Sequence, residues 1–453
     1  MTRNHDRNRA WAGRPLVKTA GGASTGASVD CGVPPPEPTR KLASLSWTRS
    51  FILLAVVASL AALLGARSAT FLQGSDFPHF YCAARMLADG RGNQLYDVAV
   101  QQQYQARYAG RIGTLYTHPP FEALLYLAVA WLPLRRAYLL WSLLSVGFFA
   151  AAARRLAKET LSPWDWRVLF AVSLCFAPAL VCLLQGQDSM LLLSLVMLAF
   201  TALRCGRAFA AGCWLGLGLF KFQLLLPLVL VLVFTQGRRA TTGLAKGFGL
   251  LLLVLAGLSV GISGWSVLAL YPNFLLHYKE HQVIADILPQ AMANFRGLVF
   301  LCFGSDHSPF AIIAVAMLSG TALLITVRAW RDAPISNLAQ ADRGLDSLGK
   351  PAFDLAFATT VLFALLVSYH LYPHDLSLLW LPLVLLLRAS VGTAPSTSFL
   401  RRLALGLVAV LFLPPLHLLT LQFRNYALVS IALTGLFAVS AFWAVRARAA
   451  GSK

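Results

Sequence analysis

Long apolar stretches alternate with short polar turns along most of the chain. The runs at residues 51–64, 191–200, 224–234 and 250–260 contain no charged side chain and are rich in Leu and Ala. In lipid every backbone N–H and C=O group must be satisfied within the protein, so such runs form helices or closed barrels. The runs show no alternation with a period of two, which excludes a barrel. The pattern therefore predicts an all-α polytopic membrane protein.

Basic residues cluster at the ends of alternate apolar runs and so orient the helices in the membrane. Lys and Arg mark cytoplasmic turns, and the turns between these clusters contain few of them. The count predicts about twelve transmembrane helices with the N- and C-termini both cytoplasmic. The marking pairs are Arg154 and Arg155, Arg204 and Arg207, Arg238 and Arg239, Arg328 and Arg331, Arg401 and Arg402, and Arg446 and Arg448.

Composition agrees with this class of protein. Hydrophobic residues make up 58% of the chain and charged residues 12%, about half of the roughly 25% that soluble domains carry. A net charge of +20 would suggest nucleic-acid binding in a soluble protein. Here the positive-inside distribution accounts for the charge, so we expect membrane lipids and no nucleic acid as partners.

The domain organisation follows from where polar residues gather. Residues 1–46 are rich in Arg, Gly, Pro, Ser and Thr and are predicted to form a disordered cytoplasmic tail. Residues 47–448 form the multi-span domain, with long extracytoplasmic loops at about 73–118 and 263–308. Residues 118–153 must cross the membrane once, either as one span or as a re-entrant helix followed by a span.

Asp76 is the first candidate for chemistry, because it directly follows the first predicted span. Aromatic residues and Pro78 flank it, and partial loss of hydration makes a carboxylate a stronger base. The alternative is a structural role as the N-cap of a helix over residues 80–88. The spacing alone leaves both interpretations open.

Lys221 is the lysine that lies deepest within an apolar region. An ionisable side chain there is unfavourable unless it serves a function or finds a partner. At the outer end of a span it either reaches the membrane interface with its ammonium group or holds an anionic phosphate. These two roles are weighed equally.

Two further polar clusters fall on the extracytoplasmic side. His370, His374 and Asp375 share one turn, but their spacing is not specific for a metal, so contact with phosphate or hydroxyl groups is favoured. Arg296 lies in the second long loop, where it either binds a phosphate through two hydrogen bonds or is an ordinary solvated residue.

The order of the motifs resembles glycosyltransferase family 87, which contains GT-C-type membrane enzymes including polyprenyl-phosphate-mannose-dependent α-mannosyltransferases. The resemblance covers about residues 50–445. It rests on Asp76 followed by Tyr81-x-Ala83-Ala84, then Leu95-Tyr-Asp97, Tyr116-x-x-Pro-Pro-Phe121, Gly186-Gln187, Lys221, and the late turn with His370, His374 and Asp375.

The resemblance implies a GT-C-type fold and inverting transfer of a sugar, expected to be mannose, from a polyprenyl-phosphate carrier. The acceptor would be a hydroxyl group of a glycolipid or glycan at the outer face of a cell inner (plasma) membrane. Asp76 would be the general base, with Lys221, His370, His374 and Arg296 at the donor phosphate or sugar. No metal and no cofactor is expected. Supporting roles fall to His79, Tyr81, Asp97, His118, Gln187 and Asp375.

Two other functions remain open from the sequence. One is a lipid-linked transferase for another sugar, such as arabinose or glucose. The other is a lipid-carrier transporter without catalysis, which would place ionisable residues at mid-depth in several spans. Only Lys221 meets that description.

Overall fold

The computed structural model describes residue 72 and residues 75–160, 166–277, 288–331, 349–392 and 398–449. Within these ranges the chain is helical and contains no strand, which confirms the predicted all-α class. The predicted tail and the predicted first span, about 50–70, lie outside the described residues.

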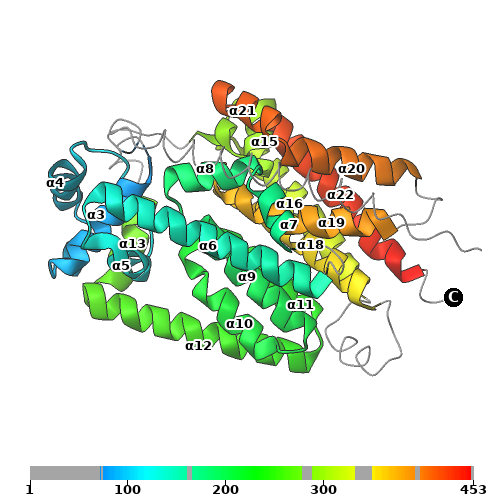
Figure 1. Cartoon of the computed structure of the whole chain (residues 1–453), viewed down its shortest axis with the longest axis horizontal. Coiled ribbons are helices and arrows are strands. Elements are labelled where there is room, and N and C mark those ends of the chain that lie inside the picture. Colours follow the sequence, from blue (N-terminus) through cyan, green and yellow to red (C-terminus); the bar gives the residue numbers. More distant parts are fainter. Residues whose placement is uncertain are drawn as a thin grey trace, which may run out of the picture. The chain divides into compact units, whose positions relative to one another are not determined.

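The N-terminal half of the described chain combines one long helix, α6, with shorter ones (Figure 1). Its α-helices are α3 (Phe77–Ala88), α4 (Val98–Ala109), α5 (Ala123–Ala130), α6 (Leu134–Thr160), α7 (Trp166–Ser173), α8 (Ala177–Gln185), α9 (Ser189–Arg204), α10 (Ala208–Leu217) and α11 (Phe222–Thr235). Single 3₁₀ turns stand between some of them, namely η1 (Gly92–Gln94), η2 (Pro120–Glu122) and η3 (Leu219–Lys221).

The C-terminal half follows the same pattern of long helices joined by short ones. Its α-helices are α12 (Arg238–Ser263), α13 (Val267–Leu276), α15 (Phe295–Phe303), α16 (Pro309–Trp330), α18 (Gly349–Val367), α19 (Trp380–Gly392), α20 (Ser398–Phe412), α21 (Pro414–Phe423) and α22 (Ala427–Ala449). The 3₁₀ turns are η4 (Pro289–Ala291) and η6 (Asp375–Leu379).

Four helices of the described ranges, α6, α12, α16 and α22, are long and apolar enough to cross a membrane. Three bent pairs would bring the number to seven: α7 with α8 (69°), α10 with η3 and α11 (64°), and α20 with α21 (55°). Four shorter apolar helices accompany them. Because the first predicted span is not described, the count of about twelve crossings stays a prediction.

The segment at 118–153, for which the sequence leaves two arrangements open, is divided into two helices. Helix α5 ends at Ala130 and α6 begins at Leu134. Pro133 lies between them, and a proline lacks the N–H that would continue a helix. The two long segments predicted as loops are also partly helical, since 73–118 contains α3 and α4, and 263–308 contains α13 and α15.

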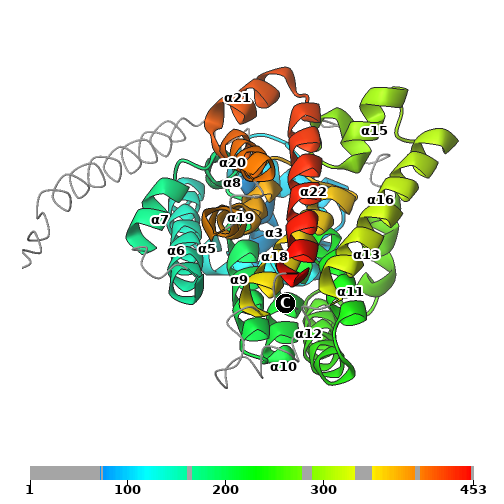
Figure 2. The same ribbon diagram turned by 90° about the vertical axis from the view of Figure 1, so that its right-hand side faces the viewer.

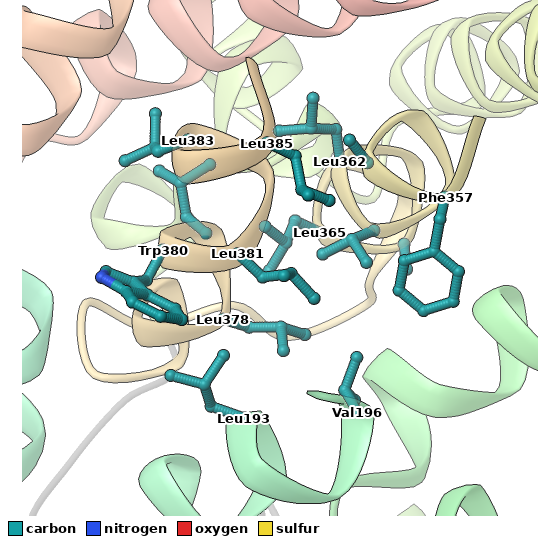
Figure 3. Close-up of a cluster of buried hydrophobic side chains, with 14 of the residues drawn as sticks. Leu193, Val196, Phe357, Leu362, Leu365, Leu378, Trp380, Leu381, Leu383 and Leu385 are labelled. Carbon is teal, nitrogen blue, oxygen red and sulfur yellow. The ribbon is translucent and has the colours of Figure 1, made fainter. Parts of the chain in front are cut away.

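The larger of two buried clusters joins α9, α18, α19 and α22 (Figure 3). Leu193 of α9, Phe357 of α18 and Leu381 of α19 are fully buried within it. Lipid tails are as apolar as these side chains, so close van der Waals packing holds such helices together in a membrane. Figure 2 shows α18 and α22 running side by side in this part of the molecule.

The smaller cluster is aromatic and joins α3, α4, α5 and the start of α6. Phe80 of α3 stacks on Tyr126 of α5 with ring centroids 4.6 Å apart, and Tyr126 also contacts Trp141 of α6 at 4.1 Å. Tyr96, which follows η1, packs against Tyr271 and Phe274 of α13. The cluster thus fixes the first helical turn of α3, where Asp76 lies.

Glycines allow α10 and α12 to approach each other closely. A Cβ atom on Gly212 would overlap the backbone of Leu244, and one on Gly247 would overlap the carbonyl oxygen of Phe209. Small residues at such a contact are typical of membrane helices, because they let the backbones touch. By contrast, Gly249 of the same helix has nothing within 4 Å of such an atom.

Gly247→Ala is therefore expected to lower the thermal unfolding midpoint of the detergent-solubilised protein by several degrees, since overpacking costs about 1–3 kcal/mol. Gly249→Ala is the matched control. It should leave the midpoint unchanged or raise it slightly, because Ala favours a helix over Gly by about 1 kcal/mol. Equal midpoints for the two variants would show that the α10–α12 contact does not depend on Gly247.

Candidate active site

A cavity of about 640 Å³ gathers polar side chains from segments far apart in the sequence. Its lining comes from the start of α3, residues 114–119, the turn between α8 and α9, η3, the end of α13, and residues 369–375. Eight of the eleven predicted site residues are among those that line it: Asp76, His79, His118, Gln187, Lys221, His370, His374 and Asp375.

Asp76 stands at the N-cap position of α3, but its side chain does not cap the helix. One carboxylate oxygen, Oδ2, accepts a hydrogen bond of 2.7 Å from Nε2 of Gln187. The backbone N–H of Asp76 donates to Oε1 of Gln185 at 3.0 Å. Oδ1 has no hydrogen-bond partner among the described residues. The carboxylate therefore faces the cavity with one oxygen held and the other open.

The turn between α8 and α9 supplies both side chains that hydrogen-bond to Asp76. Gly186 ends α8 in the left-handed conformation, with φ at 67°. A Cβ atom there would come within 2.7 Å of Cβ of Phe77, so both the backbone angle and the packing require glycine. This contact lets Gln185 and Gln187, on either side of Gly186, reach Asp76.

Lys221 is almost completely buried, with 1% of its surface exposed. Its ammonium nitrogen lies 2.9 Å from Oδ1 of Asp375 and 3.2 Å from Oδ1 of Asp188. It also donates to Oε1 of Gln187 at 3.3 Å. The contact with Asp188 is an ion pair rather than a hydrogen bond. Among the described residues that line the cavity, Lys221 is the one Lys or Arg.

Asp375 connects this ion cluster to the late turn. Its Oδ1 accepts a hydrogen bond of 3.0 Å from the Ser189 hydroxyl group, and its Oδ2 lies 3.6 Å from Nε2 of His374. Burial alone would raise the pKa of the Asp375 carboxyl group. The neighbouring Lys221 ammonium outweighs burial, so the net pKa lies below its usual range.

Four histidines line the same cavity. Burial lowers the pKa of His118 to about 3 and that of His370 to about 4, and it lowers the pKa values of His79 and His374 as well. All four imidazoles are therefore neutral at pH 7 and offer one N–H donor each. The described residues contain no group of three or more His, Cys, Asp or Glu side chains arranged to hold a metal ion.

Two of these imidazoles lie side by side. His79 and His118 stack with ring centroids 5.8 Å apart and planes inclined by 16°. Nδ1 of His118 lies 2.9 Å from Oε2 of Glu122, which is fully buried. The two imidazoles thus form part of the cavity wall. One of them, His118, contacts the buried carboxyl group of Glu122 on its other side.

Three predicted site residues do not line the cavity. Arg296 forms an ion pair with Asp306 and lies over the ring of Tyr369, 4.3 Å from its centroid. Asp97 caps α4 by accepting from the backbone N–H of Val100, and the hydroxyl group of Tyr81 donates to the backbone of Leu132. Arg296 supports a lining residue, whereas Asp97 and Tyr81 stabilise local structure.

Three residues of the α8–α9 turn, namely Gln185, Asp188 and Ser189, were not expected at the site from the sequence. Each of them contacts a predicted site residue: Asp76, Lys221 and Asp375 respectively. The available signal was a short polar run, residues 185–189, placed around a glycine and directly before a long apolar helix.

The model of glycosyltransferase family 87 matches residues 116–342, half of the 453 residues. The chain belongs to glycosyltransferase family 87. No curated protein and no solved structure matches it. The membership and the apolar helices together confirm the predicted class, a polytopic helical membrane glycosyltransferase.

The family match is shorter than the resemblance expected from the motifs, which ran from about 50 to 445. His118, Gln187 and Lys221 lie within the matched residues. Asp76 and the late turn at 370–375 lie on either side of them. The cavity of this family 87 enzyme thus brings residues from outside the match into contact with residues inside it.

The lowered histidine pKa values predict a loss of stability in acid. A histidine whose pKa is lower in the folded than in the unfolded protein binds its proton mainly on unfolding, so stability falls as pH drops below about 6.5. The unfolding midpoint is expected to fall between about pH 7 and about pH 4.5. His370→Gln should make this fall smaller, whereas exposed His277→Gln should keep the wild-type slope. Equal slopes for all three proteins would contradict the assignment.

Proposed function

We propose that this enzyme transfers mannose from polyprenyl-phosphate-mannose to a hydroxyl group of a glycolipid or glycan acceptor, with inversion at the anomeric carbon. One observation carries the proposal. A single cavity combines the Asp76 carboxylate, of which one oxygen is hydrogen-bonded and the other has no partner among the described residues, with the hydrogen-bond donors His370 and His374. The reaction needs both a base and a site for the leaving phosphate.

Asp76 serves as the general base in this scheme. Its free oxygen, Oδ1, accepts the proton of the acceptor hydroxyl group. At the same time the oxygen of that hydroxyl group attacks the anomeric carbon. A general base must lie within hydrogen-bond reach of the proton that it removes. The held oxygen restricts rotation of the carboxylate, so the open oxygen keeps one direction in the cavity.

The departing group is a polyprenyl phosphate, which gains negative charge as the sugar leaves. Preorganised donors that face this charge lower the barrier. His370 and His374 supply neutral N–H groups at the cavity wall. The ammonium of Lys221 already lies beside oxygens of Asp188, Asp375 and Gln187, so in this scheme its main role is to hold these three residues.

The remaining lining supports a lipid-borne donor. Phe222, Leu275 and Leu276 line the cavity, and Leu276 is 82% exposed. An apolar surface that continues from the cavity to the outside of the protein suits an isoprenoid chain, whose burial provides affinity in proportion to apolar area. The scheme uses no metal or cofactor, and it places the reaction at the outer face of an inner (plasma) membrane.

The test is sugar transfer from synthetic polyprenyl-phosphate-mannose by purified wild type, Asp76→Asn and Asp97→Asn. Asn keeps the shape of Asp but not its basicity, so Asp76→Asn is expected to lose about 10²–10⁴-fold in kcat, the range of general-base catalysis. Asp97→Asn is the matched control and should keep activity, because Asn caps a helix as well as Asp.

Each outcome has a distinct meaning. Full activity in a folded Asp76→Asn variant would contradict the assignment of the base. Transfer from the arabinose or glucose donor in place of the mannose donor would contradict the sugar assignment. Absence of transfer from every polyprenyl-phosphate sugar would contradict the proposed donor class.

A further inference from the structure

The Gln187 side chain accepts one hydrogen bond and donates another. Its Oε1 accepts a hydrogen bond from Lys221 at 3.3 Å, and its Nε2 donates to Oδ2 of Asp76 at 2.7 Å. An ammonium group can only donate and a carboxylate can only accept. The two neighbours therefore fix which end of the amide faces which group.

We propose that Gln187 is the positioning residue for the base, holding one oxygen of the Asp76 carboxylate so that the second oxygen is directed at the acceptor hydroxyl. This inference rests on the proposed function, in which Asp76 removes the acceptor proton. Gln187 itself does not exchange a proton with either substrate. It acts through Asp76.

The backbone of Gln187 is fixed as firmly as its side chain. Its N–H donates to the carbonyl oxygen of Cys182 at 3.1 Å. Its own carbonyl oxygen accepts from the indole N–H of Trp141 at 3.4 Å and from the thiol of Cys182 at 3.5 Å. With 4% of its surface exposed, the residue is almost completely buried. A carboxylate held by such a group keeps its direction.

The contact also links the base to the ion cluster. The Lys221 ammonium polarises the Gln187 amide, and hydrogen bonds in a chain strengthen one another. The amide N–H consequently becomes a better donor to Asp76. The chain from Lys221 through Gln187 therefore holds Oδ2 of Asp76 and leaves Oδ1 without a partner among the described residues.

Gln187→Glu separates this role from a purely structural one. A Glu carboxylate still accepts from Lys221, but it donates nothing to Asp76 and adds a like charge beside it. The acidic limb of kcat/KM against pH is expected to move up by about one pH unit or more. At neutral pH, kcat should fall by about 10²-fold, while KM for the donor changes less than about threefold.

Gln223→Leu is the matched control, since Gln223 is a second glutamine that lines the cavity. It should leave the acidic limb of the pH profile where wild type has it. Gln187→Leu removes both contacts of the amide and should also lower kcat more than it changes KM. A folded Gln187→Glu variant with the wild-type acidic limb would overturn the proposal.

A second readout does not depend on catalysis. The titration of the Asp76 carboxyl group is followed by ¹³C NMR of Asp-labelled protein, with Asp76→Asn identifying its signal. If wild type transfers no sugar but Gln187→Glu moves this titration to higher pH, the positioning contact stands and the proposed function falls. If transfer is observed but the titration does not move, the proposed function stands and the role of Gln187 falls.

Discussion

The burial of the Lys221 ammonium is the constraint on which the rest of the site depends. A buried charge without partners is strongly destabilising, whereas a paired one fixes the groups around it. Three oxygens surround this ammonium, from Gln187 and Asp188 of the α8–α9 turn and from Asp375 at the start of η6. Because these elements are distant in sequence, the lysine joins them into one wall of the cavity. Asp76 is attached to that wall through Gln187.

The proposed sugar transfer accounts for this arrangement in a member of glycosyltransferase family 87. A transferase must hold a base beside an acceptor and stabilise a leaving group in one enclosed space. The aromatic cluster fixes the first turn of α3, and the larger cluster fixes α9 and the helices around it. Gly186 lies where the two clusters meet, since it packs against Phe77 and directly precedes the residues that begin α9. The candidate site thus lies where the two buried clusters meet.

Much of the fold was readable from local patterns, but the contacts of the site were not. The apolar runs at 191–200, 224–234 and 250–260 lie within α9, α11 and α12, whereas the sequence left open whether 118–153 is one helix or two. Lys221 was predicted as a site residue because a charged side chain in an apolar run is unfavourable unless it has a function or a partner. Its partners could not be predicted, because Asp375 is more than 150 residues away and only the tertiary fold brings it near. The site roles expected of Asp97 and Arg296 stay predictions, because a local cap and an ion pair with Asp306 occupy these side chains outside the cavity.

Product stereochemistry tests the central claim most directly, namely that a hydroxyl activated by Asp76 displaces the donor phosphate in one step within this cavity. The anomeric configuration of the transferred sugar is determined by NMR of the purified product and compared with that of the donor. A single displacement predicts inversion. A product that retains the configuration of the donor would exclude a single in-line displacement, and it would contradict the role of Asp76 as the base in such a step.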